Sequence, residues 1–537
     1  MKLSFEGIRD KSNWKQIRLP AYDAVTASEE GKAHPVWAHF GIGNIFRVFL
    51  GGIADDLLES GDLKGGITAV ETFDFDIVDR IYRPFDNLIL SVILHEDGRE
   101  EKKVLASVAE AVKGCAQDAP SWLRLREVFA SDTLQFVSFT ITEKGYALRD
   151  SSGAFFPAVK KDLENGPSSP VHAMSILTAM LVERFHAGAA PLALVSMDNC
   201  AHNGSLLRDA VLAVAGAWKD AGFVDDDFLR YVSDENRVAF PWTMIDKITP
   251  RPSQEVAQRL KDAGAEDMDP VLTSKRTYIA PFVNAEGPQY LVIEDHFPNG
   301  RPPLEKGKGV YLTDRETVNR AERMKVTACL NPIHTALGPA GVVLGYDLFS
   351  DEMQDPDMLT LARQVGYSEG LPVAPNPGIL SPKAFLDECM LHRFPNPYLG
   401  DTCLRLCTDA SQGLGVRFGV TIRAYMEKDG TAASLKGIPL AIALWLRYML
   451  AVDDKGRPYE LAPDPLNEEV TELFRDIRFG DPSTVTHQLE SILSNEHIFT
   501  VNLYSAGIGG KITRLFKSSI AGEGALRSTI QEEIASW

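Results

Sequence analysis

The first half of the chain alternates short apolar runs with longer segments of helical periodicity. Strands are predicted for five apolar runs that end in turns, namely residues 35–41, 66–72, 87–94, 135–142 and 191–199. Helices are predicted where apolar side chains recur every three to four positions, as they do in residues 44–60 and 171–188. Strands and helices that alternate in this way favour a parallel sheet covered by helices.

The second half of the chain has a different character. A stretch rich in Pro, Gly and Lys (HFPNGRPPLEKGKG) begins near residue 297 and is typical of a linker or a surface loop. Beyond it, nearly every periodic segment is helical, from residues 314–330 to residues 486–494. We therefore predict an α/β domain over residues 1–297 and a mainly helical domain over residues 298–537.

Composition excludes several classes of protein. A chain of 537 residues is too long to fold around a single hydrophobic core. Its hydrophobic content of 45% excludes disorder of the whole chain. A net charge of -19 argues against a globally basic nucleic-acid binder. No apolar run reaches about eighteen residues, and the polar N-terminus lacks a signal peptide, so we expect a cytoplasmic protein without a membrane partner. The 6 cysteines are too sparse for a disulfide scaffold or a zinc site, so no metal is expected.

A glycine-rich turn lies between a predicted strand and a predicted helix, in the segment HFGIGNIFR. Gly41 can form the tight turn, and Gly43 lets the backbone approach a pyrophosphate bound at the helix N-terminus. The third glycine of the usual fingerprint is absent, because that position holds Phe46. A dinucleotide would contact the whole turn, which consists of Gly41, Ile42, Gly43, Asn44, Ile45 and Phe46. The alternative is an ordinary glycine turn between strand and helix.

A carboxylate at the end of the second predicted strand would bind the ribose hydroxyls of such a cofactor. Glu71 has this position, but Asp74 and Asp76 follow closely, so the sequence leaves the choice among the three open. A carboxylate there repels a 2′-phosphate, which favours NAD over NADP. Alternatively, one of these acids only caps the helix that is predicted to follow.

Many polar groups gather in three further segments, namely residues 196–204, 240–250 and 325–334. In the last of these, Pro332 argues against one continuous helix. We predict that a first helix ends near Leu330 and that a second begins with Asn331 as N-cap and Pro332 as its first residue. Asn331 and His334 then share one first turn, which Lys325 can face from the preceding helix.

These side chains suit hydride transfer between an alcohol and a ketone without a metal. Burial lowers the pKa of a lysine, so a neutral Lys325 can take the alcohol proton. Neutral Asn331 and His334 can donate hydrogen bonds to the reacting oxygen. The alternatives are a solvated lysine, an ordinary Asn-Pro helix start and a structural histidine.

With these motifs, the chain resembles the long-chain polyol dehydrogenases, also called the mannitol dehydrogenase family. The matching elements are HFGIGNIFR, TITEKGY, SMDNCAHNG, FPWTMIDKITP and a K-x5-N-x2-H signature formed by Lys325, Asn331 and His334. Residues 393–411 also resemble a segment of the family's helical domain. The resemblance implies a Rossmann-type N-terminal domain with a parallel sheet, followed by a mainly helical C-terminal domain.

The resemblance also implies roles at the reacting centre. Lys325 is expected to be the general base that deprotonates the alcohol. Asn331, together with Asn199, is expected to bind the reacting oxygen. His334 is expected to hold a substrate hydroxyl beside it.

Other roles implied by the resemblance concern the rest of the substrate and the proton. Asp246 and Arg405 are expected to contact the remainder of the sugar chain. Glu143 and Glu322 are expected to line a proton path to the base. The expected cofactor is NAD, which supplies the hydride chemistry, and no metal is implied.

The basic residues of the second half guide the choice of substrate. Mannitol-type members are expected to carry a lysine eight residues after Arg405, where this chain has Gly413, and the nearest cation is Arg417. A uronate needs a cation for its carboxylate, ideally an arginine, and both Arg405 and Arg417 qualify. We therefore predict the interconversion of a sugar acid and its keto form, D-mannonate and D-fructuronate.

Several alternatives remain open. Within the family these are mannitol 2-dehydrogenase and other polyol dehydrogenases, including a tagaturonate reductase. Outside it they are a non-catalytic NAD-binding sensor and a structural scaffold. In each enzymatic case the partner is a small sugar acid or polyol, and the chain is expected to be a monomer or a weak homo-oligomer.

Overall fold

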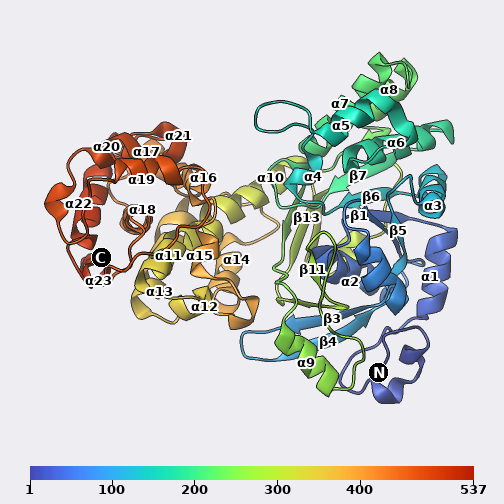
Figure 1. Ribbon diagram of the computed structural model, residues 1–537, viewed down its shortest axis with the longest axis horizontal. Helices are drawn as coiled ribbons and strands as arrows, with labels where there is room; N and C mark the ends of the chain where they lie inside the picture. The colour runs from blue at the N-terminus through green and yellow to red at the C-terminus, as the bar shows by residue number, and fades with distance from the viewer. The chain divides into compact units, whose positions relative to one another are not determined.

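The computed structural model describes residues 1–537, which form two compact units, Met1–Asn319 and Arg320–Trp537 (Figure 1). The boundary predicted after residue 297 is therefore placed too early. The reason is a strand beyond the Pro/Gly-rich stretch: β14 (Val310–Thr313) pairs in parallel with β13 (Tyr290–Glu294) and ties the stretch into the first unit. That stretch is a loop within the unit and not a linker.

The predicted parallel sheet is confirmed. All neighbouring strands in it run parallel, in the order β5-β2-β1-β6-β7-β8. Its strands are β5 (Val108–Lys113), β2 (Ile67–Glu71), β1 (Trp37–Phe40), β6 (Phe136–Phe139), β7 (Leu192–Ser196) and β8 (Val238–Ala239). The order reverses direction between β1 and β6, and such a reversal is where open α/β sheets bind ligands.

Helices cover both faces of this sheet because alternate side chains of each strand point to opposite sides. Trp37 and Phe136 join one apolar core, whereas Phe40 and Val137 join the other. The first core is closed by α1 (Ala24–Ala33) and α2 (Gly51–Ser60), and the second by α3 (Ala119–Ala130), α6 (Ala173–His186), α7 (Asn203–Asp220) and α8 (Asp226–Ser233). These helices are labelled in Figure 1.

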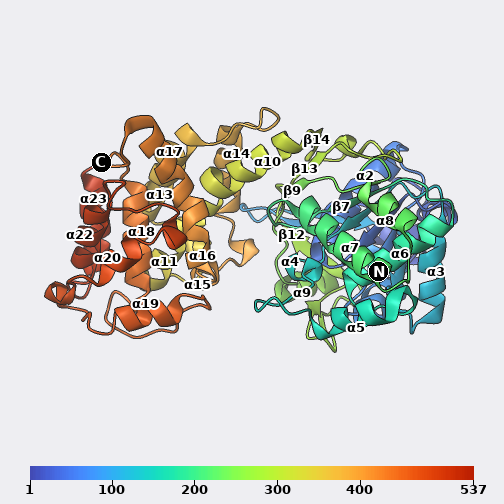
Figure 2. The same ribbon diagram turned by 90° about the horizontal axis from the view of Figure 1, so that it is seen from above.

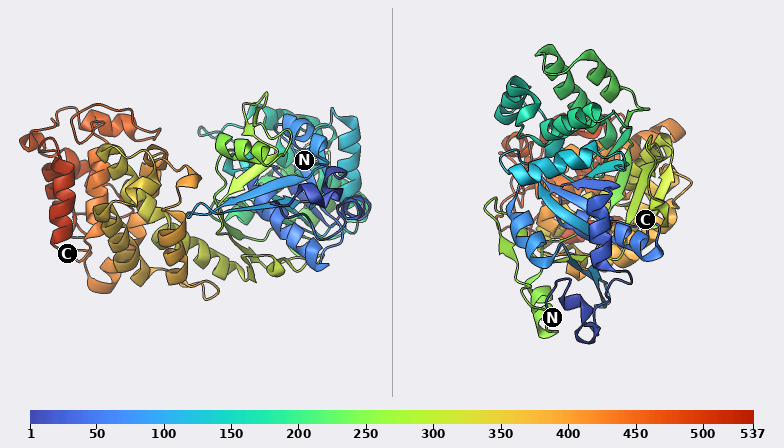
Figure 3. Two further views of the ribbon diagram at one scale, coloured as in Figure 1. Left: turned by 90° about the horizontal axis from the view of Figure 1, so that it is seen from below. Right: turned by 90° about the vertical axis from the view of Figure 1, so that its right-hand side faces the viewer.

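Two three-stranded sheets complete the first unit. In one, β3 (Ile89–Leu94) lies between β12 (Phe282–Ala285) and β4 (Glu100–Leu105), and its hairpin with β4 is seen in blue in Figure 3. In the other, β13 lies between β14 and β9 (Thr243–Asp246). The short pair β10 (Val271–Leu272) and β11 (Tyr278–Ile279) is antiparallel.

The second unit is helical, as predicted, and appears in yellow to red in Figure 2. Its centre is α18 (Gly437–Tyr448), in which every residue is buried and which packs against α11 (Asn331–Leu344). Around them lie α13 (Pro356–Arg363), α14 (Pro382–Glu388), α15 (Cys403–Leu406), α16 (Ala410–Leu414), α17 (Val420–Asp429), α19 (Asn467–Leu473), α20 (Gln488–Leu493), α22 (Gly509–Ser519) and α23 (Ala525–Ala535). None of the chain's helices has both the length and the apolar character needed to cross a bilayer.

Candidate active site

The glycine turn after β1 lies at the point where the strand order reverses. Gly41 has a φ of +89°, and a Cβ atom there would overlap the carbonyl oxygen of Thr140, so only glycine fits. A Cβ atom at Gly43 would meet nothing within 4 Å, so the backbone is open to a close approach. The helix that follows begins at Asn44, and its first N–H groups lack intrahelical partners. This geometry fits the predicted pyrophosphate site.

Phe46, which stands in place of the third glycine, points into the core. Its ring stacks on the imidazole of His39 with a centroid distance of 4.2 Å, and both residues are fully buried. The imidazole also contacts the hydroxyls of Ser138 (2.6 Å) and Thr140 (2.9 Å). Burial lowers the pKa of His39 to about 3, so the ring is neutral at pH 7. At the position where the usual fingerprint has glycine, the helix therefore packs against His39 of β1 through the ring of Phe46.

Glu71 at the end of β2 already has partners within the chain. Its Oε1 accepts hydrogen bonds from the backbone N–H groups of the next three residues, at 3.0, 2.9 and 3.2 Å. Burial raises the pKa of Glu71, and these hydrogen bonds oppose the shift. The carboxylate thus caps the turn after β2 and not the helix that follows, which begins at Asp76, and its contact with a ribose stays a prediction.

The two acids that follow are also engaged. Asp74 is buried and accepts a hydrogen bond from the hydroxyl of Thr273 at 2.6 Å. Asp76 accepts one from the backbone N–H of Ser274 at 2.7 Å. Both acids therefore hold the segment between β10 and β11 against the turn after β2.

The polar segments of the first unit form one hydrogen-bonded network. Asp198 accepts hydrogen bonds from the backbone of Ile141 and Thr142, both at 2.9 Å, and from the hydroxyl of Tyr146 at 2.6 Å. The buried Asn203 exchanges hydrogen bonds with Thr243 at 2.9–3.1 Å. Neither Asp198 nor Asn203 is among the site residues predicted from the sequence. The signal was present, since Asp198 lies two residues after the buried strand β7 and Asn203 is the first residue of the helix that follows.

Three predicted site residues lie on the rim of this network. Asn199 is exposed and directly follows Asp198. Glu143 is exposed and begins α4 (Glu143–Tyr146). Asp246 is half-buried and is the last residue of β9. The roles of all three stay predictions.

The predicted break between Lys325 and His334 is present, but it differs in detail. Lys325 is only 2% exposed and opens a π-helical turn, Lys325–Cys329. Leu330 departs from helical geometry (φ -122°, ψ -64°) and occupies the N-cap position, so Asn331 is the first residue of α11 and not its cap. The wider π turn, closed by the Leu330 N–H on the Lys325 carbonyl at 3.1 Å, ends the first segment at Cys329. The prediction was therefore wrong by one residue.

The first turn of α11 presents the remaining signature residues. The ring of His334 lies 4.9 Å from the rings of both Phe349 and Phe394, measured between centroids. The Oδ1 atom of Asn331 is buried and has no hydrogen-bond partner within the chain, so its amide retains capacity for a ligand. Glu322 is half-buried and lies three residues before Lys325 on the same helical run.

The two predicted carboxylate-binding arginines differ sharply. Arg405 is 61% exposed at its side chain and forms an ion pair with Asp401. Arg417 donates a hydrogen bond to the hydroxyl of Thr335 at 2.7 Å and has no carboxylate partner. Burial alone lowers the pKa of Arg417.

Gly413 provides the space that the guanidinium of Arg417 occupies. A Cβ atom at Gly413 would lie 2.7 Å from Nε, 2.8 Å from Cζ and 3.0 Å from Cδ of Arg417. Thr335, on which Arg417 rests, is the neighbour of His334 in α11. Because Gly413 has no side chain, the guanidinium of Arg417 can lie against Thr335, which is next to the signature residue His334 in the sequence.

Three cationic residues of the regions described above lie in π-helical turns. Arg47, Lys325 and Arg417 each lie in a five-residue π-helical turn, namely Phe46–Leu50, Lys325–Cys329 and Gly415–Gly419. Such turns are rare and are frequent at functional sites, because the extra residue redirects side chains. Three further π-helical segments, Val78–Tyr82, Gln364–Gly370 and Cys389–Arg393, lie elsewhere in the chain, so this geometry alone does not mark a site.

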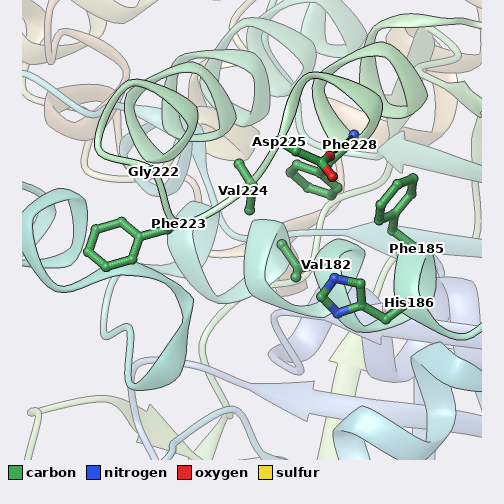
Figure 4. A pocket seen from close by; sticks show the side chains of 8 residues that line it. All are labelled: Val182, Phe185, His186, Gly222, Phe223, Val224, Asp225 and Phe228. Atoms are coloured by element: carbon green, nitrogen blue, oxygen red, sulfur yellow. Dashed lines mark hydrogen bonds between the residues drawn. The ribbon is translucent and has the colours of Figure 1, made fainter.

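A small pocket elsewhere contains none of the predicted residues. Its volume is about 260 Å³, and it lies between the end of α6 and the connection from α7 to α8 (Figure 4). Apolar side chains, among them Phe185 and Phe228, form much of its lining, with His186 and Asp225 beside them. Asp225 is used to cap α8 through the N–H of Phe228 at 2.9 Å. The pocket is therefore separate from the glycine turn.

Comparison with known proteins identifies the family. Residues 37–306 match the mannitol dehydrogenase Rossmann domain, and residues 317–514 match the mannitol dehydrogenase C-terminal domain. The chain belongs to the mannitol dehydrogenase family. It is similar to a D-mannonate oxidoreductase of Thermotoga maritima, with 48% identity over 99% of both chains.

Two solved structures have the same architecture. The Pseudomonas fluorescens mannitol 2-dehydrogenase in complex with NAD and D-mannitol is 28% identical, with a TM-score of 0.71 over 100% of both chains. A substrate-free D-sorbitol dehydrogenase shares the fold, with 24% identity and a TM-score of 0.79 over 98% of both chains. The chain is accordingly an oxidoreductase, as these relatives are.

Proposed function

We propose that this member of the mannitol dehydrogenase family reduces D-fructuronate to D-mannonate with NADH and catalyses the reverse reaction with NAD. The observation that carries the proposal is Arg417, a half-buried cation without a carboxylate partner. A hexuronate differs from a neutral sugar by its carboxylate, which an arginine can bind through two parallel hydrogen bonds. The name of the Thermotoga maritima relative, D-mannonate oxidoreductase, supports the same substrate.

In this proposal, Lys325 moves the proton. During reduction its ammonium group donates a proton to the carbonyl oxygen of the substrate, and during oxidation the neutral amine takes that proton back. Burial of Lys325, which is 2% exposed, keeps bulk water from competing for the proton. Asn331 donates a hydrogen bond from its amide N–H to the reacting oxygen, and its unused Oδ1 can accept one from a substrate hydroxyl. His334 positions a neighbouring hydroxyl.

The first unit provides residues that suit NAD. The open backbone at Gly43 and the first turn of the following helix suit the pyrophosphate. Glu71 stands at the end of β2, where a carboxylate suits a ribose without a 2′-phosphate. The cofactor, when bound, would accept the hydride as NAD and supply it as NADH. The chain's own residues bind and orient the cofactor and the substrate, and they move the proton.

A polyol is the second candidate substrate. The solved relative that binds D-mannitol is a mannitol 2-dehydrogenase, and it matches this chain over its full length. Against this candidate, a polyol offers only hydroxyl groups, which leave the charge of Arg417 without a counter-ion.

The test is NADH oxidation at 340 nm with four keto sugars: fructuronate, tagaturonate, fructose and fructose 6-phosphate. We expect turnover with fructuronate and little with fructose. Turnover with fructose alone would reject the uronate proposal, and turnover with tagaturonate alone would change the stereochemistry of the substrate. Fructose 6-phosphate shows whether the cation serves a phosphate instead.

The variant Arg417→Met makes this test specific. We expect kcat/KM for fructuronate to fall about 100-fold, since a charge-assisted hydrogen bond is lost, while the weak rate with fructose stays unchanged. Arg423→Met is the matched control, because Arg423 is an exposed arginine of the next helix that bonds only the carbonyl of Thr500. Equal losses with fructuronate and fructose would show that Arg417 has only a structural role.

A further inference from the structure

Three arginines of this chain are buried to 1% exposure or less, namely Arg47, Arg184 and Arg447. Two of them are fully used by the backbone. The guanidinium of Arg184 donates hydrogen bonds to five carbonyl oxygens at 2.8–3.0 Å. That of Arg447 donates to three, at 2.6–3.1 Å. These two arginines show how the chain stabilises a buried guanidinium when its task is to hold loops.

Arg47 does not follow this pattern. Its Nη1 atom lies 3.4 Å from Oδ1 of Asn44, a long hydrogen bond at best. Its Nε and Nη2 atoms are buried and have no hydrogen-bond partner. The nearest compensation is the ring of Tyr82, whose centroid lies 5.9 Å from the guanidinium carbon.

An unpaired buried cation of this kind costs stability. Charged donors removed from water without acceptors lose their hydration and gain nothing in return. Burial lowers the pKa of Arg47 only to about 10, so the side chain remains charged at neutral pH. The fold therefore keeps a full positive charge with two unused donors at this position.

The surroundings of Arg47 indicate an anion. The residue lies in the first turns of the helix that begins at Asn44, and its N–H bonds the carbonyl of Gly43 at 3.1 Å. Its guanidinium faces the side chain of Asn44, directly after the open glycine. Tyr82 connects the same turn from the other side through a hydrogen bond to the carbonyl of Ile42 at 2.8 Å. Charge, unused donors and an open backbone thus meet at one turn.

We propose that Arg47 is a cofactor-binding residue whose charge and unused N–H groups are reserved for the phosphate groups of the dinucleotide. The proposal rests on the cofactor assigned under the proposed function and adds a residue to its site. It implies that the apoprotein is less stable than it would be without this charge, and that cofactor binding compensates for the cost. A purely structural arginine would behave in the opposite way.

The test compares Arg47→Met with the matched variant Arg184→Met in the same unit. Binding of NADH is followed by fluorescence, and binding of ADP and of adenosine by calorimetry, all without substrate. For Arg47→Met we expect NADH and ADP to bind about tenfold to a hundredfold more weakly, because hydrogen bonds to a charged group are lost. Adenosine, which has no phosphate, should bind within twofold of the wild type.

Thermal unfolding of the apoprotein is the second measurement. Arg47→Met should keep or raise the melting temperature, since an unpaired charge is replaced by an apolar side chain of similar length. Arg184→Met should lower it, because five hydrogen bonds to backbone carbonyls are lost, and should leave ADP binding unchanged. Arg47→Lys keeps the charge and should retain most of the ADP affinity.

Defined outcomes would overturn the proposal. Wild-type affinity of Arg47→Met for ADP would do so, and so would an equal loss of ADP and adenosine. A fall in melting temperature as large as that of Arg184→Met would show a structural role. If Arg47→Met does not fold, Arg47→Gln, which also removes the charge, decides: it should bind ADP at least about tenfold more weakly and adenosine as the wild type does. Absence of NADH binding by the wild type would instead reject the proposed cofactor, whereas a failure to reduce fructuronate would leave this inference intact.

Discussion

The two units of this chain treat the charged side chains of their candidate sites in opposite ways. In the first unit, the carboxylates of Glu71 and Asp198 accept hydrogen bonds from backbone N–H groups of neighbouring loops. In the second unit, Arg417 has a single hydroxyl partner and no carboxylate. The acids are used to fix loops, whereas the cation remains available.

This difference indicates which charged side chains of the protein are available to bind a charged ligand. A carboxylate that holds two or three backbone N–H groups stabilises a loop conformation, and only its remaining lone pairs can accept hydrogen bonds from a ligand. A desolvated cation that has neither a counter-ion nor acceptors for most of its N–H groups costs free energy, so its retention indicates an anionic partner. Arg47 is the exception in the first unit, and by the same reasoning it indicates the phosphates of a cofactor.

The largest effect is expected from Lys325→Met. If the second unit carries the proton chemistry, kcat should fall about a thousandfold, the usual range for loss of a general acid or base. NADH affinity, measured by fluorescence, should change less than twofold. Lys436→Met is the matched control, because Lys436 is a lysine of the same unit that donates to the terminal carbonyl of Trp537. A kcat within tenfold of the wild type would break the comparison between the units.

A smaller effect, on stability and not on turnover, is expected at His39. Its pKa is about 3 in the folded chain and about 6.5 in the unfolded chain. As the pH falls below 6.5, the unfolded chain takes up a proton that the folded chain excludes, so stability is present above this pH and is lost below it. Between pH 7 and pH 5 this loss amounts to about 2 kcal/mol.

His39→Gln should remove this pH dependence. We expect the free energy of unfolding of the variant, measured in urea at pH 7 and pH 5, to fall by about 2 kcal/mol less than that of the wild type. His34→Gln at an exposed position should follow the wild type. An unchanged slope in His39→Gln would show that this imidazole is not held neutral, and would weaken the view that the first unit's polar groups are saturated by internal bonds.

Much of the fold could be predicted from the sequence because local periodicity determines it. The strands that end near Phe40, Glu71 and Ser196 and the helix over residues 173–186 lie where the hydrophobic pattern placed them. The domain boundary was misplaced because it depends on the pairing of β14 with β13, a contact that composition does not encode. The π turns were missed as well, since one extra residue in a helix hardly alters the hydrophobic pattern.

The candidate site was predictable in its residue types but not in its partners. The K-x5-N-x2-H signature and Pro332 predicted a helix break, which the structure places at Leu330. Whether Glu71 is a cap or a ligand depends on backbone N–H groups whose directions only the folded turn defines. The same limit applies to Asp198, because its partners come from a segment more than fifty residues earlier.

The smallest effect is expected from Gly413→Ala, and it addresses the second unit most closely. The added Cβ would lie 2.7–3.0 Å from the guanidinium side of Arg417, so the arginine must shift, although it keeps its charge. If the exact position of that cation selects the substrate carboxylate, KM for fructuronate should rise about threefold to tenfold with kcat unchanged. If Gly413 serves only to allow close helix packing, Gly413→Ala should not raise KM for fructuronate selectively.

Gly510→Ala is the matched control, since a Cβ there, also within a helix of the second unit, meets nothing within 4 Å. In the double variant Gly413→Ala/Arg417→Met, the effect of the alanine on KM should disappear, because the group that it displaces is gone. Additive losses would mean that Gly413 and Arg417 act independently. The lack of a carboxylate partner at Arg417 would then need an explanation other than substrate binding. Only Arg47 would remain as an arginine without an anionic partner, in contrast to the acids, whose partners lie within the chain.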